Sequence, residues 1–360
     1  MEKTARQFIE TVGKYKSIVI FIPGSPDPDA IASAYAIKVM LKVIDVQADI
    51  IAERRLSLSQ NQAFIDRLKI PVSFSREINL NKYQGYIVPD FQNNRVDSIG
   101  DALPCVAHLD HHGKDKTSVK AEFSLIRTDV GSTSTLVSLL MKYSGLKIEP
   151  PDQVVVATAL TFGIQTDTDQ YKNITTSDLE ALIYLSENVD RDFLEGINSM
   201  PPSLQTLEIF NRAKENETVY RDWAFYGIGY IDAKNRDSIA IAADMLLRNS
   251  DHMVVAVFAI IENQRKQETF LDVSLRSNSS SIDLNRVIKR ITPNGGGRKY
   301  KGAYQVKLNY LQNTPDREML WQVVETATLE TLRKSRDSLY ITGLQRIYSN
   351  IKDKISSLVK

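Results

Sequence analysis

The sequence predicts an α/β fold, with a parallel-sheet domain covered by helices on both faces and a smaller mixed α/β domain after it. In the first half of the chain, short apolar runs alternate with helical patterns, an order that is typical of parallel sheets. A linker-like stretch at 198–203 then separates this half from a second series of strands and helices. A chain of 360 residues is long enough for two domains of ordinary size.

The composition indicates an ordinary globular protein, with 42% hydrophobic residues, 25% charged residues and a net charge of +1. This charge provides no broad basic field for a long duplex, although a short anionic ligand is compatible with it. Cys105 is the single cysteine, so no disulfide forms within the chain, which suits a reducing compartment. No apolar run approaches the roughly 20 residues that span a bilayer, so we expect a cytoplasmic protein without membrane contact.

The first predicted unit is a strand over 17–22, a tight loop at Pro23-Gly24, and a helix over 30–44 with apolar residues at helical spacing. Further elements are expected as strands at 47–52, 85–88 and 105–109, helices at 59–68 and 94–100, and a mainly helical region from 131 to about 197. We expect these elements to form one domain over 1–197.

The loop after the first strand carries two acids, Asp27 and Asp29, on either side of Pro28. Pro28 disfavours the helical region for the residue before it, so the backbone is expected to be extended, with both carboxylates on one side. Two converging carboxylates repel each other unless a cation lies between them. In the alternative interpretation, Asp29 is only a helix N-cap.

The triplet Asp110-His111-His112 follows the apolar run 104–109, which reads as a buried strand. It is therefore expected at the carboxyl end of that strand, where ligands bind in open α/β sheets. Three of the four histidines of the chain fall in this stretch, the third being His108. A polar loop with surface histidines is the alternative.

Two more acids are expected at loop positions: Asp90 at the end of the third strand, and Asp167 after an Ala-rich helical stretch. Each could be an ordinary turn or helix-terminal residue, but together the acids and the histidine pair are predicted to meet at one edge of the sheet. Oxygen ligands with an imidazole favour Mn²⁺ or Mg²⁺ and leave Zn²⁺ open, whereas a single cysteine excludes a Cys-rich site. A carboxylate that bridges two ions about 3.5–4 Å apart is typical of two-metal phosphoryl hydrolysis.

These motifs resemble the DHH phosphoesterases, and within them the nanoRNase branch of oligoribonucleases and pAp-phosphatases, which carries a DHHA1 second domain. The resemblance covers about residues 18–306. It consists of four motifs in the family's order: Pro26-Asp27-Pro28-Asp29-Ala30 with Ser33, then Asp90, then Leu109-Asp110-His111-His112, then Gly163-Ile164 with Asp167-Thr168. It implies a parallel-sheet DHH domain, a linker and a mixed α/β DHHA1 domain.

The resemblance implies a site for two Mn²⁺ ions, with Mg²⁺ as a substitute. The ligands of the first ion would be Asp29, Asp90, His111 and Asp167, and those of the second would be Asp27 and a bridging Asp90. Asp110 resembles the acid that orients a neighbouring imidazole, and His112 resembles the residue that contacts the scissile phosphate. The nucleophile would be a hydroxide held by the metals.

One position departs from the family pattern. Members usually carry a histidine four residues before the first motif aspartate, and this chain has Pro23 there, which offers no ligand atom. We therefore expect weaker or single occupancy of the second ion site, unless water, Ser25 or a backbone carbonyl substitutes. Slow or narrowed activity, or a homologue without catalysis, would follow.

The region 198–214 is expected to link the domains, and the second domain is expected over 215–312. Its glycine run, Gly295-Gly296-Gly297, precedes Arg298, so that backbone amides and a guanidinium could hold a phosphate. A flexible turn is the alternative. The nanoRNase branch carries its substrate-binding glycine motif at this place, although most members have histidine where this chain has Arg298.

Arg276 with Ser277 resembles the Arg-Ser pair through which the second domain contacts the nucleotide. Alternatively, Arg276 is an exposed arginine at a strand end. Tyr300 and Tyr304 could stack on a base or could simply pack. Strands are expected around this region at 223–231, 253–261 and 269–275, with helices at 237–248 and 282–291.

The last segment, 313–360, is predicted to be a helical extension. Apolar side chains recur at three- and four-residue spacing and form one stripe: Leu344, Ile347, Ile351, Ile355 and Leu358. We expect the stripe to pack on the second domain of the same chain, with a homodimer contact as the alternative.

The sequence therefore predicts a manganese-dependent phosphodiesterase or exonuclease of short single-stranded RNA or DNA, including nanoRNA and dinucleotides such as pApA. Cyclic di-AMP and 3′-phosphoadenosine 5′-phosphate (pAp) are rival substrates, and pyrophosphate is the least favoured. Short substrates suit a net charge of +1, because few phosphates need neutralising. A nucleotide-binding sensor or scaffold without catalysis is the alternative, motivated by Pro23 and by Arg298 in place of histidine.

Overall fold

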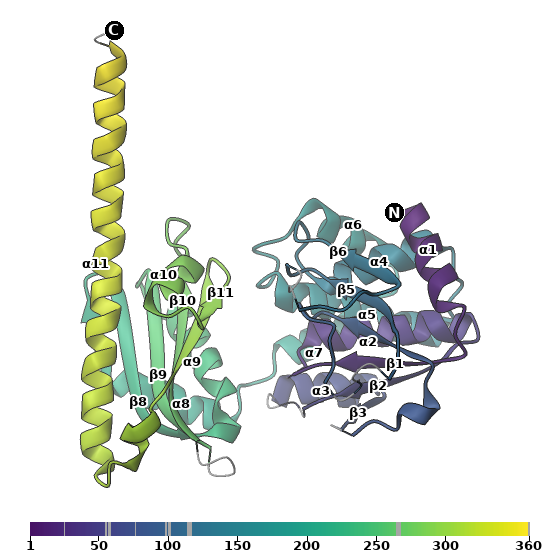
Figure 1. Ribbon diagram of the computed structural model, residues 1–360, viewed down its shortest axis with the longest axis horizontal. Helices are drawn as coiled ribbons and strands as arrows, with labels where there is room; N and C mark the ends of the chain where they lie inside the picture. The colour runs from purple at the N-terminus through teal and green to yellow at the C-terminus, as the bar shows by residue number, and fades with distance from the viewer. Residues whose placement is uncertain are drawn as a thin grey trace. The chain divides into compact units, whose positions relative to one another are not determined.

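The computed structural model describes residues 1–24, 26–54, 56, 59–75, 77–97, 99, 102–113, 117–263 and 268–358. The chain divides into two compact units, Met1–Pro201 and Pro202–Lys360, and each unit has a sheet of its own (Figure 1). The predicted α/β class, with a parallel sheet followed by a mixed second domain, is confirmed.

In the first unit, parallel strands form a six-stranded sheet in the order β3-β2-β1-β4-β5-β6. The strands are β1 Ser17–Ile22, β2 Gln47–Ala52, β3 Val72–Phe74, β4 Gly85–Pro89, β5 Cys105–Asp110 and β6 Phe123–Ile126. The chain runs outward from β1 through β2 to β3, and then returns to the other side of β1 with β4. Ligands in such sheets bind outside the carboxyl ends of the strands where the order reverses. That reversal lies between β1 and β4.

The helices of the first unit are α1 Glu2–Val12, α2 Pro28–Val43, α3 Ser59–Leu68, α4 Thr133–Ser144, α5 Pro150–Asp167, α6 Thr176–Leu185 and α7 Arg191–Asn198. Their apolar residues form one core with alternate side chains of β1, Ile18 and Ile20 among them. The intervening side chains, such as Val19, pack on the opposite face against residues that include Val96 and Ile99. Strand β1 is therefore buried on both faces, as a central parallel strand should be.

The helix expected at 94–100 is absent from the described residues of that segment. Asn93 Oδ1 accepts the Arg95 amide at 2.9 Å, and Asn94 Nδ2 donates to the Val119 carbonyl at 3.1 Å. The first bond is local, and local bonds from short polar side chains compete with the hydrogen bonds of a helix, while the second ties Asn94 to a distant segment. They explain why the helical pattern failed here.

In the second unit, a mixed sheet has the order β11-β12-β10-β9-β8-β7, in which β8 and β9 are parallel and the other neighbours antiparallel. The strands are β7 Glu217–Tyr220, β8 Trp223–Asp232, β9 Val254–Asn263, β10 Glu268–Ser277, β11 Gly296–Gly297 and β12 Lys301–Lys307. Helices α8 (Leu204–Glu215) and α9 (Asp237–Arg248) share a core with one face of the sheet. Helices α10 (Leu284–Ile291) and α11 (Arg317–Leu358) share a core with the other face.

Helix α8 lies in the region 198–214 that was expected to link the domains. It is part of the second unit, because Thr206 Oγ1 donates to Ser238 Oγ of α9 at 3.0 Å and Ile209 is buried in the core beneath α9. The linker-like composition is confined to 198–203, and the rest of the region is the helix α8.

Helix α11 is 42 residues long, in agreement with the predicted helical extension. Its first half packs on the second sheet through Leu320, Val324 and Leu332, and Trp321 stacks on Phe258 at 5.8 Å between ring centroids. The side chains of the apolar stripe from Leu344 to Leu358 lie outside the described residues. Among the described helices, none combines the length and apolar content that a membrane crossing requires.

Candidate metal centre

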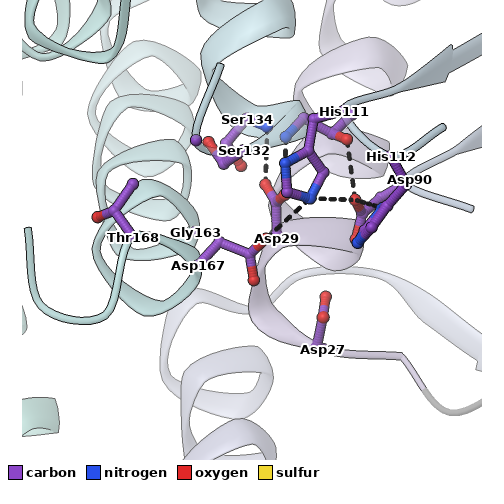
Figure 2. Close-up of polar contacts among 12 residues, drawn as sticks. Asp27, Asp29, Asp90, His111, His112, Ser132, Ser134, Gly163, Asp167 and Thr168 are labelled. Carbon is purple, nitrogen blue, oxygen red and sulfur yellow. Dashed lines mark hydrogen bonds and ion pairs between the residues drawn. The ribbon is translucent and has the colours of Figure 1, made fainter. Parts of the chain in front are cut away.

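The predicted metal ligands of the first unit gather where β1, β4 and β5 end and where α2, α4 and α5 meet (Figure 2). Figure 2 shows His111 joined by dashed contacts to neighbouring carboxylates, with Asp27 apart from them. Among the described residues, two groups of three side chains each have their ligand atoms within 4.8 Å of one another. One group is Asp29, His111 and Asp167, and the other is Asp90, His111 and His112.

Asp29 lies in the first turn of α2, fully buried, and its carboxylate faces the N-terminus of α4. It accepts the Thr133 amide at 2.8 Å and the Ser134 amide at 2.7 Å. The first amides of a helix have no partner within the helix, and the helix dipole favours an anion there. The N-cap of α2 is Asp27, which accepts the Ala30 amide at 2.9 Å, so the interpretation of Asp29 as a mere N-cap is wrong.

Asp90 follows β4 directly and has a left-handed backbone, with φ of 55°. Aspartate tolerates this conformation better than most residues, and here it sharply turns the chain at the strand end. One Asp90 oxygen accepts the Thr133 hydroxyl at 2.8 Å and lies 3.6 Å from His111 Nε2. Asp90 is thus held by the same helix terminus as Asp29.

The imidazole of His111 is almost fully buried, and its Nε2 atom lies 2.9 Å from Asp167 Oδ2. Gly163, one turn before Asp167 in α5, makes this approach possible. A Cβ atom at Gly163 would lie inside van der Waals contact of Ser134 Oγ and 3.2 Å from Asp29 Cα. The glycine therefore lets α5 pack closely against α2 and α4, which brings Asp167 to the cluster.

Asp110 is fully buried and holds His112. Its Oδ1 atom accepts the His112 amide at 3.1 Å and lies 2.9 Å from His112 Nδ1. A carboxylate at this position favours a proton on Nδ1 and fixes the orientation of the ring. The His112 side chain is 31% exposed, so its Nε2 atom is the ring nitrogen suited to face a ligand.

Burial and neighbouring carboxylates raise the pKa of two acids of the cluster, Asp90 and Asp29. Burial raises the pKa of Asp90 well above its ordinary value, and three neighbouring acids raise it further: Asp29, Asp27 and Asp167. Burial also raises the pKa of Asp29, with Asp167 as the next cause. Each of these groups resists ionisation because a negative charge there is both desolvated and repelled.

A divalent cation would remove that repulsion, and the donor set suits one. Carboxylate oxygens with one or two imidazoles are ligands for Mn²⁺ or Mg²⁺. Asp110 Oδ2 is also buried without a hydrogen-bond partner among the described residues, as expected where part of a polar cluster is completed by a bound group. Pro23, half-buried at the end of β1, contributes no ligand atom.

The sequence reasoning missed Thr133 and Ser134, whose amides hold Asp29. The available signal was Ser132, a preferred N-cap residue just before an apolar helical pattern, since a helix N-terminus is a ready binding site for anions. Only the tertiary fold shows that this helix terminus binds carboxylates of the same chain.

Arg276 and Ser277 belong to the second unit, at the end of β10. The interpretation of Arg276 as an exposed arginine is wrong, because the residue is only 8% exposed. Its Nε atom donates to Asp244 Oδ1 at 2.8 Å, and Nη1 donates to Ser274 Oγ at 3.0 Å. Lys301, directly opposite on β12, lies 3.4 Å from the same Asp244 oxygen. Ser277 Oγ donates to the Met253 carbonyl at 3.0 Å.

The glycine run forms a short hairpin, in which Gly296 and Gly297 pair with β12. None of the three glycines has a positive φ, and two of them, Gly295 and Gly297, are required by close packing. A Cβ atom at Gly295 would lie 2.5 Å from Ile288 Cγ2, and one at Gly297 would overlap the Lys301 carbonyl. Arg298 is exposed at the turn, and its amide donates to the Lys301 carbonyl at 2.7 Å.

The two tyrosines near the glycine run differ in exposure. Tyr304 is 3% exposed and packs in the core of the second unit, which excludes stacking on a base. Tyr300 is partly exposed, with the Lys299 ammonium 5.2 Å from its ring centroid.

Comparison with known proteins agrees with this architecture. Residues 17–164 match the DHH family, N-terminal domain, and residues 225–318 match the DHHA1 domain. Uncharacterized protein MJ1633 of Methanocaldococcus jannaschii is 30% identical over 331 residues, 91% of this chain and 64% of that protein. The chain therefore spans less than two thirds of that relative's length.

Among solved structures, an exopolyphosphatase-related protein from Bacteroides fragilis has a TM-score of 0.69 at 18% identity, covering 94% of this chain and 98% of that one. At this identity the likeness shows a common fold. The structure of exonuclease RecJ bound to manganese has a TM-score of 0.46 at 11% identity, covering 90% of this chain and 93% of that one.

The fold and the site define a two-domain α/β protein with a buried cluster of carboxylates and imidazoles at one edge of its parallel sheet. The two domain matches together cover more than half of the 360 residues, and the chain belongs to the DHH family, with an N-terminal DHH domain and a DHHA1 domain. The resemblance to this family is confirmed, whereas the nanoRNase branch stays a prediction.

Proposed function

We propose that the protein is a manganese-dependent phosphodiesterase of short oligonucleotides and dinucleotides such as pApA. Cyclic di-AMP and pAp are further candidate substrates. The observation that carries the proposal is the buried convergence of three carboxylates on one imidazole, Asp29, Asp90 and Asp167 around His111. Such a cluster is unstable without a cation and is suited to holding one beside a phosphate.

In this proposal, Asp29, Asp90, His111 and Asp167 hold the first ion, and Asp27 with Asp90 holds a second. A bound ion would lower the pKa of its water and so supply a hydroxide near neutral pH. His112 contacts the scissile phosphate through Nε2, and Asp110 holds the His112 ring in place for that contact. The helix terminus at Thr133 and Ser134 fixes two of the acids.

The exposure of Asp27 and the proline at position 23 support unequal ion sites. Asp27 is exposed, and its carboxylate already caps α2. The second ion would therefore have few protein ligands and would exchange readily with solvent. We expect Mn²⁺ to bind the first site more tightly than the second.

The second unit is proposed to hold the nucleotide end of the substrate. Arg276, Ser277, the glycines from Gly295 to Gly297, and Arg298 are the candidate contacts. Arg276 and Lys301 share Asp244, so this group of three carries one net positive charge, which favours a phosphate. Arg298 presents an exposed guanidinium at the hairpin turn.

A nucleotide-binding sensor without turnover is the second candidate. Two substitutions favour it: Pro23, where the family usually has a histidine ligand, and Arg298, where most members have histidine after the glycines.

Release of AMP from pApA by purified protein with Mn²⁺ distinguishes the two candidates. The hydrolase should turn over pApA, and Asp90→Asn and His111→Ala should abolish turnover. Asp152→Asn, a change in a surface pair with Lys42, is the matched control and should retain it. Binding of pApA without turnover by the parent would favour the sensor instead.

A further inference from the structure

Asp178 is a fully buried acid that lies outside the set of proposed metal ligands. It is the third residue of α6, where it takes part in a capping box with Thr175. Burying a carboxylate is unfavourable unless hydrogen bonds replace its lost hydration. Its partners therefore indicate what the acid stabilises.

The Asp178 carboxylate accepts hydrogen bonds from three groups, two backbone amides and one hydroxyl. The Thr175 amide donates at 2.7 Å within the capping box of α6. The other two donors come from a different segment: the Gly131 amide lies 3.0 and 3.1 Å from the two oxygens, and the Thr135 hydroxyl donates at 2.6 Å. A cap for α6 alone would need neither of these bonds.

The segment that Asp178 holds is the start of α4, between Gly131 and Thr135. Thr133 and Ser134 lie between these two residues, and their amides are those that bind Asp29. The Thr133 hydroxyl also binds Asp90. Asp178 thus fixes the backbone on both sides of the donors that position two proposed ligands, at Gly131 two residues before Thr133 and at Thr135 directly after Ser134.

Gly131 also contacts the segment that carries the third acid. A Cβ atom at Gly131 would lie 2.5 Å from Asp178 Oδ2 and 2.5 Å from Thr168 Cγ2. Thr168 is fully buried and directly follows Asp167 at the end of α5. Gly131 is therefore packed between Asp178 and the residue next to a proposed ligand.

We propose that Asp178 is a positioning residue for the metal centre. Through its bonds to the start of α4, it positions Asp29 and Asp90. Through the packing of Gly131 on Thr168, it also positions Asp167. This inference rests on the metal centre of the proposed function. A carboxylate is required because every partner donates. An asparagine would direct its own N–H groups at one of these donors.

The test is a Mn²⁺ titration of the metal-stripped protein, followed by the electron paramagnetic resonance signal of free and bound Mn²⁺. Asp178→Asn should weaken Mn²⁺ binding by about 10- to 100-fold, the range typical of residues that position ligands. Thr175→Ala is the matched control, since it removes the hydroxyl that accepts the Asp178 amide at 3.3 Å but leaves the bonds to Gly131 and Thr135. This control should lower the melting temperature and leave Mn²⁺ affinity unchanged.

Thr135→Val removes one donor with little change in volume, and should weaken Mn²⁺ binding by a smaller factor even if Asp178→Asn does not fold. Parent-like affinity in both Asp178→Asn and Thr135→Val would overturn the positioning role, as would an equal loss in Thr175→Ala. A parent that binds no Mn²⁺ would instead overturn the metal centre itself, and the inference with it.

Discussion

Gly163 is the point at which α5 passes closest to the helices that hold the proposed ligands. In Gly163→Ala, the new Cβ would overlap Ser134 Oγ and lie 3.2 Å from both Ser134 Cβ and Asp29 Cα. A rotation of Ser134 relieves only the first contact, because the other two atoms are fixed by the backbone. We expect α5 to shift away from α2 and α4. Asp167, one helical turn further along the same face of α5, should shift with it.

Two opposing effects set the size of the change in stability. Alanine in a helix interior is favoured over glycine by about 1 kcal/mol. Overpacking a core costs about 1–3 kcal/mol, and the contact with backbone at Asp29 places the cost near the upper end. We therefore expect Gly163→Ala to lower the free energy of unfolding by about 1–2 kcal/mol, and to weaken Mn²⁺ binding about 10-fold or more through the displaced Asp167.

Urea unfolding and Mn²⁺ titration of Gly163→Ala, Ser134→Ala and the double variant measure these effects. Ser134→Ala keeps the amide that binds Asp29 and removes the overlapping hydroxyl, so the double variant should recover part of both losses. A single Gly163→Ala variant with the stability and the Mn²⁺ affinity of the parent would refute the reasoning.

Three further predictions concern charge and association. Because the folded-state pKa of Asp90 is raised above its ordinary value of 3.8, the metal-free protein should lose stability as the pH rises from about 4 through the raised pKa. In urea unfolding with a chelator present, Asp90→Asn should reduce this loss of stability. An unchanged dependence of stability on pH in Asp90→Asn would contradict the raised pKa of Asp90. Arg276→Gln should weaken pApA binding about 10-fold or more, as measured by calorimetry. The control Lys307→Gln changes an exposed pair with Glu268 and should have little effect. An affinity of Arg276→Gln equal to that of the parent would exclude Arg276 as a contact of the nucleotide. If the stripe of α11 joins two copies, Ile351→Asp should convert a dimer into a monomer in light scattering, and a monomeric parent would exclude this contact.

The positions of two acids of the cluster could be predicted from the sequence because each lies at the end of an apolar strand. Asp90 and Asp110 end β4 and β5, and parallel strands end at one edge of a sheet, so linear order alone places these acids together. Short strands of ordinary composition, such as β3 and β6, lack such a signal and were not predicted.

The supports of the site could not be predicted in the same way. The amides of Thr133 and Ser134 bind Asp29, which lies more than 100 residues earlier in the sequence. Every residue except proline has a backbone amide, so the sequence does not indicate which amides bind a side chain. Arg276 likewise reads as a strand-end arginine, until the fold brings Asp244 of α9 against it. In both cases the partner is selected by tertiary packing, which linear spacing does not record.

The central claim is that the acids around His111 hold a divalent cation. Anomalous diffraction from crystals grown with Mn²⁺ near neutral pH tests it most directly. The account predicts a strong anomalous peak among the ligand atoms of Asp29, Asp90, His111 and Asp167, with a weaker second peak near Asp27. Mn²⁺ bound elsewhere, or no peak at this cluster in protein that hydrolyses pApA, would contradict it.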